Sequence, residues 1–106
     1  MDEEFGEIIS VYPLERAIED GVLVEVFKNR WQELSQGKPI VATRHLFSQV
    51  SLAALLDIWN EYVEWRKNVM PTLPEADQMF VTIMDGEKVW LLEDGAAFTM
   101  LYPEDY

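Results

Sequence analysis

The sequence contains no cysteine and only one histidine, and its 8 basic residues are far outnumbered by 20 acidic ones. Without cysteine the chain can form no disulfide, no thiolate metal site and no cysteine nucleophile. No apolar stretch approaches the ~20 residues that a membrane-spanning helix needs. The opening residues MDEEFGEI are acidic, where a secretory signal is basic. These absences predict a cytoplasmic protein without a metal or other cofactor.

Basic residues are also too few, and too scattered, for direct binding to nucleic acid. Residues 1–26 contain eight acids and one base, and residues 73–106 contain the same numbers, so each end has a net charge of −7. Residues 27–72 contain four acids and six bases, a net charge of +2. Proteins that bind phosphates need clustered Lys and Arg. The charge pattern therefore disfavours direct phosphate binding and favours a basic partner, or no partner.

What the chain does have is apolar surface. Of its 106 residues, 49% are hydrophobic, including four Trp, four Tyr and five Phe. That is enough to build a core, while a second core would leave each half marginal for folding. We therefore expect a single acidic domain over residues 1–106.

The N-terminal half predicts short elements separated by glycine and proline. Leu14, Ala17 and Ile18 recur at helical spacing until Gly21 ends the helix. The predicted elements, in order, are a strand at 8–12, a helix of one or two turns at 13–21, a strand at 22–26, a helix at 27–34 closed by Gly37 and Pro39, and a short strand or an extended lead-in at 39–44.

The longest periodic segment predicts a helix over about residues 51–69. Its apolar stripe is expected to pack Leu55, Leu56, Trp59 and Val63 against a sheet. Residues 44–69 are either one bent helix or a short helix followed by a long one, with Ser48 or Ser51 as the N-cap.

The C-terminal segment contains three apolar runs separated by turn residues, at Asp85-Gly86 and at residues 93–95. It predicts a three-stranded antiparallel meander packed on the long helix, and hence an α+β fold. The middle run, residues 88–92, is apolar on both faces. Its second face is expected to be covered by the N-terminal elements or by a second subunit, which would make the protein a homodimer.

No residue pattern indicates catalysis. His45 has no partner motif around it and is interpreted as a structural residue at a helix start. The three acids at helical spacing on the long helix, Asp57, Glu61 and Glu64, lack a second matching helix for a metal site. They form either a solvated face or a contact with a basic partner.

Six further acids lie beside predicted turns. The hairpin acids are Asp85, Glu87, Glu93 and Asp94, which do not match a calcium loop and are explained by turn chemistry or by partner binding. Glu19 and Asp20 lie at the C-terminal end of a helix, where the dipole disfavours each negative charge by ~0.3–1 kcal/mol. That local cost suggests a contact with Lys and Arg of a partner.

Four short motifs run through the chain: Phe5-Gly6-Glu7 with Tyr12, Ala17-Ile18-x-Asp20-Gly21-Val22-Leu23-Val24, Val41-x-Thr43-Arg44, and Tyr102-Pro103-x-Asp105-Tyr106. Through them the chain resembles a small bacterial family of unknown function whose members are met on plasmids, phages and other mobile elements. The resemblance covers most of the chain and implies no catalytic residue. It implies a setting in which small acidic proteins often block host defence.

Two hypotheses for function follow from charge and setting. The first is a non-enzymatic inhibitor of the anti-CRISPR or anti-restriction type, which occupies the basic nucleic-acid-binding surface of a host nuclease or its guide complex. The second is an accessory or regulatory protein-interaction domain whose acidity serves solubility. An enzyme of unrecognised type is a third alternative. Binding through charge would weaken steeply with salt, whereas binding through an apolar interface would not.

Overall fold

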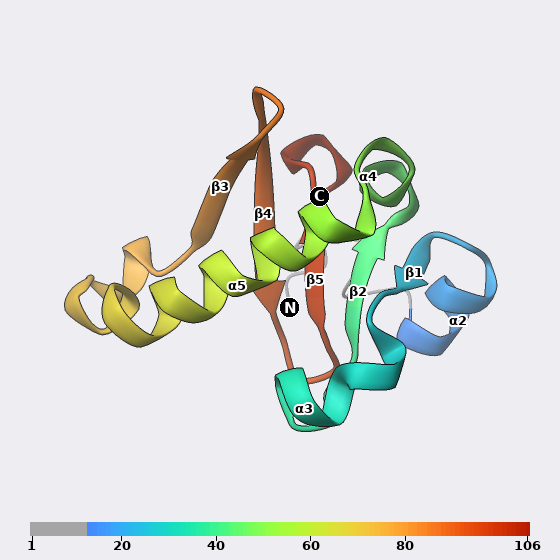
Figure 1. The fold of residues 1–106 in the computed structure, drawn as a ribbon, viewed down its shortest axis with the longest axis horizontal. Coiled ribbons are helices and arrows are strands. Elements are labelled where there is room, and N and C mark those ends of the chain that lie inside the picture. Colours follow the sequence, from blue (N-terminus) through green and yellow to red (C-terminus); the bar gives the residue numbers. More distant parts are fainter. Residues whose placement is uncertain (1–12) are drawn as a thin grey trace.

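The computed structural model describes residues 13–106, so the strand predicted at residues 8–12 lies outside the described residues. A mixed five-stranded sheet has one long helix lying across one of its faces (Figure 1). The strands are β1 (Leu23–Glu25), β2 (Ile40–Thr43), β3 (Phe80–Met84), β4 (Glu87–Glu93) and β5 (Phe98–Leu101), in the spatial order β1-β2-β5-β4-β3. The α-helices are α2 (Leu14–Glu19), α3 (Trp31–Ser35), α4 (Arg44–Gln49) and α5 (Leu52–Asn68).

The mixed α and β content is as predicted, but the predicted three-stranded meander is incomplete. Strands β3, β4 and β5 are antiparallel neighbours. However, β5 also pairs in parallel with β2, with Ile40 opposite Phe98, and β2 pairs antiparallel with β1. All residues of β2 and β5 are buried, which is typical of strands covered on both faces. The N-terminal strands therefore extend the C-terminal hairpins into one sheet.

Residues 44–69 form a short helix followed by a long one, which decides between the two predicted alternatives. The Thr43 hydroxyl caps α4 by accepting a hydrogen bond from the Leu46 N–H at 3.2 Å. The Ser51 hydroxyl caps α5 by accepting from the Ala54 N–H at 3.1 Å. Val50, between the helices, is extended (φ −129°). The predicted Ser51 cap is confirmed, while Thr43 is a cap that the sequence analysis missed.

The buried stripe of α5 differs from the predicted one. Leu55, Ile58, Trp59 and Tyr62 are at most 5% exposed and pack into the core. The prediction was wrong for two positions, since Leu56 is half-buried and Val63 is 38% exposed. The apolar stripe of the sequence is wider than the strip that contacts the sheet, so only the residues at i, i+3, i+4 and i+7 from Leu55 lie fully inside.

Glycines at turns behave as predicted at two positions. Gly21 follows α2 with φ +79°, and a β-carbon there would lie 3.4 Å from the Arg44 guanidinium. Asp85 and Gly86 both have positive φ, of 54° and 83°, as a type I′ hairpin turn requires. By contrast, Phe27 adopts a left-handed conformation, and the predicted helix at 27–34 is a 3₁₀ turn (Lys28–Arg30) followed by α3.

The sheet face opposite α5 is only partly covered in the part of the chain that the structure describes. Helix α2 and its neighbours bury Leu23, Val41 and Ala97 at one side of this face. Near the other side the ring of Tyr106 packs edge-on against Trp90, with centroids 5.7 Å apart. Beyond Trp90, the β3 residues Val81 and Ile83 are 43% and 58% exposed. This corner is where apolar side chains remain open.

Candidate functional site

The nine acidic residues predicted to bind a partner do not form one patch. Glu19 and Asp20 follow the helix beside β1, whereas Asp85 and Glu87 lie next to β3, at the opposite edge of the sheet (Figure 1). Four strand spacings separate those edges, about 19 Å. Glu87 and Glu93 begin and end β4 and are about 20 Å apart. A small contact surface can therefore include only some of the nine.

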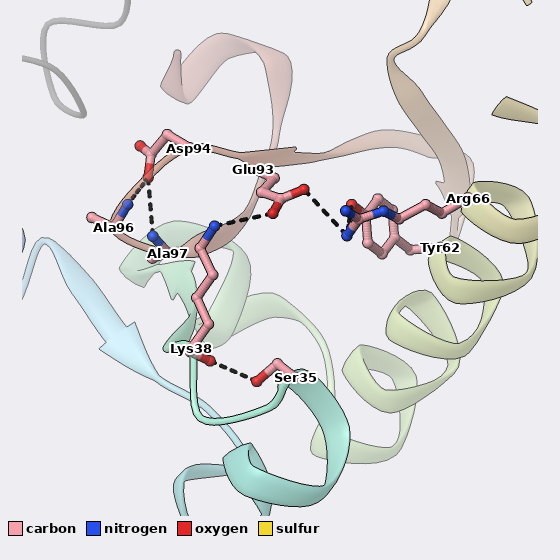
Figure 2. Close-up of polar contacts among 8 residues, drawn as sticks. All are labelled: Ser35, Lys38, Tyr62, Arg66, Glu93, Asp94, Ala96 and Ala97. Atoms are coloured by element: carbon pink, nitrogen blue, oxygen red, sulfur yellow. Dashed lines mark hydrogen bonds and ion pairs between the residues drawn. The ribbon is translucent and has the colours of Figure 1, made fainter. Parts of the chain in front are cut away.

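Glu93 and Asp94 are engaged within the molecule. The Glu93 carboxylate lies between Lys38 Nζ, at 3.0 Å, and Arg66 Nη1, at 3.2 Å (Figure 2). The Asp94 carboxylate turns the other way and accepts hydrogen bonds from the N–H groups of Ala96 and Ala97. The second acidic turn is thus organised by internal contacts, so we do not include it in the candidate partner surface.

Glu19 and Asp20 lie at the end of α2, both exposed. Asp20 forms an ion pair with Arg16, with Oδ2 3.5 Å from Nε. The i,i+4 partner offsets part of the cost that the helix dipole imposes on Asp20. The local cost that suggested a partner contact is therefore smaller than the sequence implied.

Helix α5 crosses the sheet toward β3, and two of its acids, Glu61 and Glu64, lie near this strand (Figure 1). The Glu61 carboxylate accepts a hydrogen bond from the Thr82 hydroxyl of β3 at 2.6 Å. Glu61 and Glu64 line a shallow groove of about 590 Å³ that also includes Trp65 and Phe80. Asp57 is exposed one turn before Glu61, on the same edge of the helix. Of the three acids, only Glu61 and Glu64 are therefore placed beside β3.

Strand β3 is an edge strand without the usual protection. Within residues 13–106 it pairs with β4 alone, and its five residues FVTIM include no charged residue and no proline. Edge strands commonly carry such residues because unpaired N–H and C=O groups invite another strand to pair. Val81 and Ile83 add exposed apolar surface on the face away from α5. We call β3, with Glu61, Glu64, Asp85 and Glu87 around it, the acidic edge; the predicted partner residue Asp57 is not part of it.

The acidic edge continues into the C-terminal turn η4 (Pro103–Asp105). Burial, and then the nearby carboxylates of Glu87, Glu104, Asp105 and Asp85, raise the pKa of Tyr102 above its ordinary 10.0. Four carboxylates therefore lie within electrostatic reach of one phenol. Glu104 and Asp105 were not predicted as site residues, although Asp105 belongs to the Tyr-Pro-x-Asp-Tyr motif.

Asp105 has a structural role in addition to its charge. Its carboxylate accepts a hydrogen bond from the Thr43 hydroxyl at 3.1 Å and lies 3.1 Å from His45 Nδ1. The His45 ring packs on Tyr102, with centroids 4.7 Å apart. The arrangement ties the C-terminal turn to the start of α4, which agrees with the structural interpretation of His45.

The raised pKa of Tyr102 predicts how the stability of the protein depends on pH. Because the pKa of Tyr102 is higher in the folded than in the unfolded state, its neutral phenol contributes to the free energy of unfolding. That contribution is fully present below about pH 10 and is lost as the pH rises through the folded-state pKa. We expect Tyr102→Phe to reduce the alkaline part of this loss, measured as urea unfolding at a series of pH values. An unchanged pH dependence in the variant would show that other groups, such as Tyr62, whose pKa burial also raises, govern the alkaline limit.

A second feature, not predicted from sequence, is a cleft between α3, α5 and the β4–β5 turn. It measures about 670 Å³ and is lined by Lys38, Arg66, Lys67, Glu93, Leu34, Ser35, Gln36, Val63 and the aromatic residues Trp59, Tyr62 and Phe98. We call it the basic cleft. The net charge of +2 in residues 27–72 was the only sequence signal for it. Lys38 and Arg66 come together only because the sheet brings the turn after β4 between them.

Comparisons with protein-family models, with curated proteins and with solved structures found no match. In residues 13–106 no group of three or more His, Asp or Glu side chains is arranged to hold a metal ion. Nor does any helix of that part combine the length and apolar character needed to cross a membrane. The functional inference therefore depends on the geometry of this chain.

Proposed function

We propose that this protein is a non-enzymatic binding protein whose acidic edge docks on a basic, nucleic-acid-binding surface of another protein. The single observation that carries the proposal is an unprotected, charge-free edge strand surrounded by carboxylates. All five residues of this strand are uncharged, although the chain has a net charge of −12. Unpaired backbone groups supply affinity, and the acids supply attraction to Lys and Arg.

The two sheet faces beside β3 also suggest which kind of partner segment could dock there. A strand added beside β3 would alternate its side chains between the two faces of the sheet. On the α5 face those side chains would meet Glu61 and Glu64, and on the other face they would meet Val81 and Ile83. An extended segment with basic and apolar residues in alternation fits both faces. Such a segment beside a nucleic-acid channel is the expected target.

A second copy of this chain fits the acidic edge less well. Antiparallel pairing of two β3 strands would bring the carboxylates around both strands close together, and like charges at an interface cost several kcal/mol by general estimates. The homodimer expected from sequence is therefore disfavoured at low salt relative to a basic partner.

We further propose that the gene belongs to a mobile element and that the partner is a host nuclease or its guide complex in the cytoplasm. A regulatory domain that binds through Val81 and Ile83 alone is the second candidate, favoured by their exposure. The two candidates differ in their response to salt. Binding through the carboxylates should weaken steeply with ionic strength, whereas binding through the apolar side chains should change little.

The test is affinity capture from a lysate of the organism that carries the gene, followed by binding measurements with the captured protein. We expect a partner that duplex DNA displaces and that salt releases. The double variant Asp85→Lys/Glu87→Lys and the single variant Ile83→Lys should each weaken binding by about tenfold or more, because each places a positive charge against a basic surface.

The control is Glu15→Lys on the exposed side of α2, far from β3. Its charge change of +2 lies between the +1 of Ile83→Lys and the +4 of the double variant. It should bind as the parent does. Equal loss in the control would indicate that net charge alone drives binding. Unchanged binding of Ile83→Lys would contradict docking at β3, and a partner that DNA does not displace would favour the regulatory alternative.

A further inference from the structure

The basic cleft concentrates positive charge on a strongly acidic protein. Three of the eight basic residues, Lys38, Arg66 and Lys67, line one hollow with a single carboxylate, Glu93. The local charge is therefore +2. Three acids lie next to lining residues in the sequence. Asp94 accepts hydrogen bonds from the N–H groups of its own turn (Figure 2), Glu33 pairs with Arg30 at 3.0 Å, and Glu64, three residues before Lys67 on α5, accepts a hydrogen bond from Asn68. Because salt screens exposed charges beyond about 8 Å, the distant acids do not cancel this local field.

Internal contacts hold the two central cations in place. Lys38 Nζ lies over the Phe98 ring, 5.0 Å from its centroid, and Arg66 Nη1 donates to the Tyr62 hydroxyl at 3.4 Å. The backbone at Lys38 is fixed as well, since its carbonyl accepts a hydrogen bond from the Ser35 hydroxyl at 2.6 Å (Figure 2). Glu93 bridges the two cations with one oxygen each. The pair is thus preorganised around an oxyanion.

Part of the cleft wall is apolar. Its base is formed by edges of Trp59, Tyr62 and Phe98, and Leu34 and Val63 flank it. A volume of about 670 Å³ lies within the range of small-molecule sites, which combine apolar walls with a few placed polar groups. The cleft therefore has room for a ligand body larger than an inorganic ion.

We propose that the basic cleft binds a small organic anion, a carboxylate or a phosphate monoester with an apolar body. The anionic group of the ligand lies beside Arg66 and Lys67. This position is close to the Glu93 carboxylate, which lies between Lys38 and Arg66. The apolar body lies against Val63 and the aromatic base. In this arrangement Glu93 competes with the ligand. This site is separate from the acidic edge, and its proposal does not depend on the proposed function.

The probes are phenyl phosphate, inorganic phosphate and benzylamine, titrated into the full chain at low salt and followed by chemical shifts of the backbone amides. Phenyl phosphate should bind saturably at millimolar concentrations and shift amides around Lys38, Arg66 and Phe98. Inorganic phosphate should bind more weakly, because it lacks the apolar body, and benzylammonium should not bind. Benzoate in place of phenyl phosphate distinguishes a carboxylate site from a phosphate site.

Three variants test the assignment of charge. Lys67→Gln should weaken phenyl phosphate binding by about tenfold, the factor that corresponds to about 1.4 kcal/mol. Glu93→Gln should strengthen it, because the competing carboxylate is removed. The matched control Lys88→Gln removes an exposed lysine that is the register partner of Ile83 on the opposite sheet face, and should leave binding unchanged.

Lys67 is exposed, so its variant is expected to fold. Any of three results would overturn the proposal: no saturable shift with phenyl phosphate or benzoate, equal weakening by Lys88→Gln, or weaker binding in a folded Glu93→Gln protein. The last result would mean that Glu93 is part of the binding surface rather than a competitor. Preferential binding of benzylammonium would reverse the assigned charge of the ligand.

Discussion

Replacing Phe98 by alanine should lower the free energy of unfolding by about 3–5 kcal/mol, the range for a large aromatic side chain removed from a core. Phe98 is 5% exposed and lies at the start of β5, under α5. Its ring packs edge-on against Trp59, with centroids 5.0 Å apart, and against Tyr62 at 5.8 Å. Truncation would therefore leave a cavity and also remove two aromatic contacts.

Urea unfolding followed by circular dichroism measures this loss. The control is Phe98→Leu, which keeps most of the buried volume and should lose markedly less stability. A loss below about 1 kcal/mol for Phe98→Ala would mean that α5 does not pack on the start of β5 as described.

Replacing Leu55 by alanine should cost about 2–5 kcal/mol. Leu55 is fully buried on α5, and Leu52, three residues earlier on the same helix, is 55% exposed. Leu52→Ala makes the same chemical change at similar helix propensity and should change stability by no more than about 0.5 kcal/mol.

The two α5 variants form a matched pair, compared by thermal and urea unfolding of both proteins. Similar losses at both positions would show that the helix is rotated from the orientation described, or that Leu52 packs against a surface outside the described residues.

Helix caps, turns and helix ends could be predicted from the sequence where one or two neighbouring residues determine them. The Ser51 cap, the Asp85-Gly86 turn and the stop at Gly21 each follow from the conformational preferences of one or two residues. The long helix was predictable because its apolar period extends over several turns. These are local features, and they do not depend on which segments meet in the folded chain.

The sheet order and the basic cleft could not be predicted in this way. The pairing of Ile40 with Phe98 joins residues 58 positions apart, and no turn between them specifies it. Lys38, Arg66 and Glu93 are likewise distant in sequence, and each alone is typical of a solvated surface residue. Asp57, Glu61 and Glu64 were recognised as a helical row, but the contact of Glu61 with the edge strand β3 depends on the position of that strand.

The parallel pair of β2 and β5 has a consequence for the order in which the chain folds. It is the only ladder that joins the antiparallel pair β1–β2 to the β3–β4–β5 hairpins in the described sheet. Closing it requires the intervening α5 and two turns of the meander to be nearly in place, and such non-local pairing slows folding. During synthesis β2 would emerge from the ribosome long before its partner strand. The two halves should therefore join only after β5 has emerged, with the apolar side chains of β2 unpaired on that side until then.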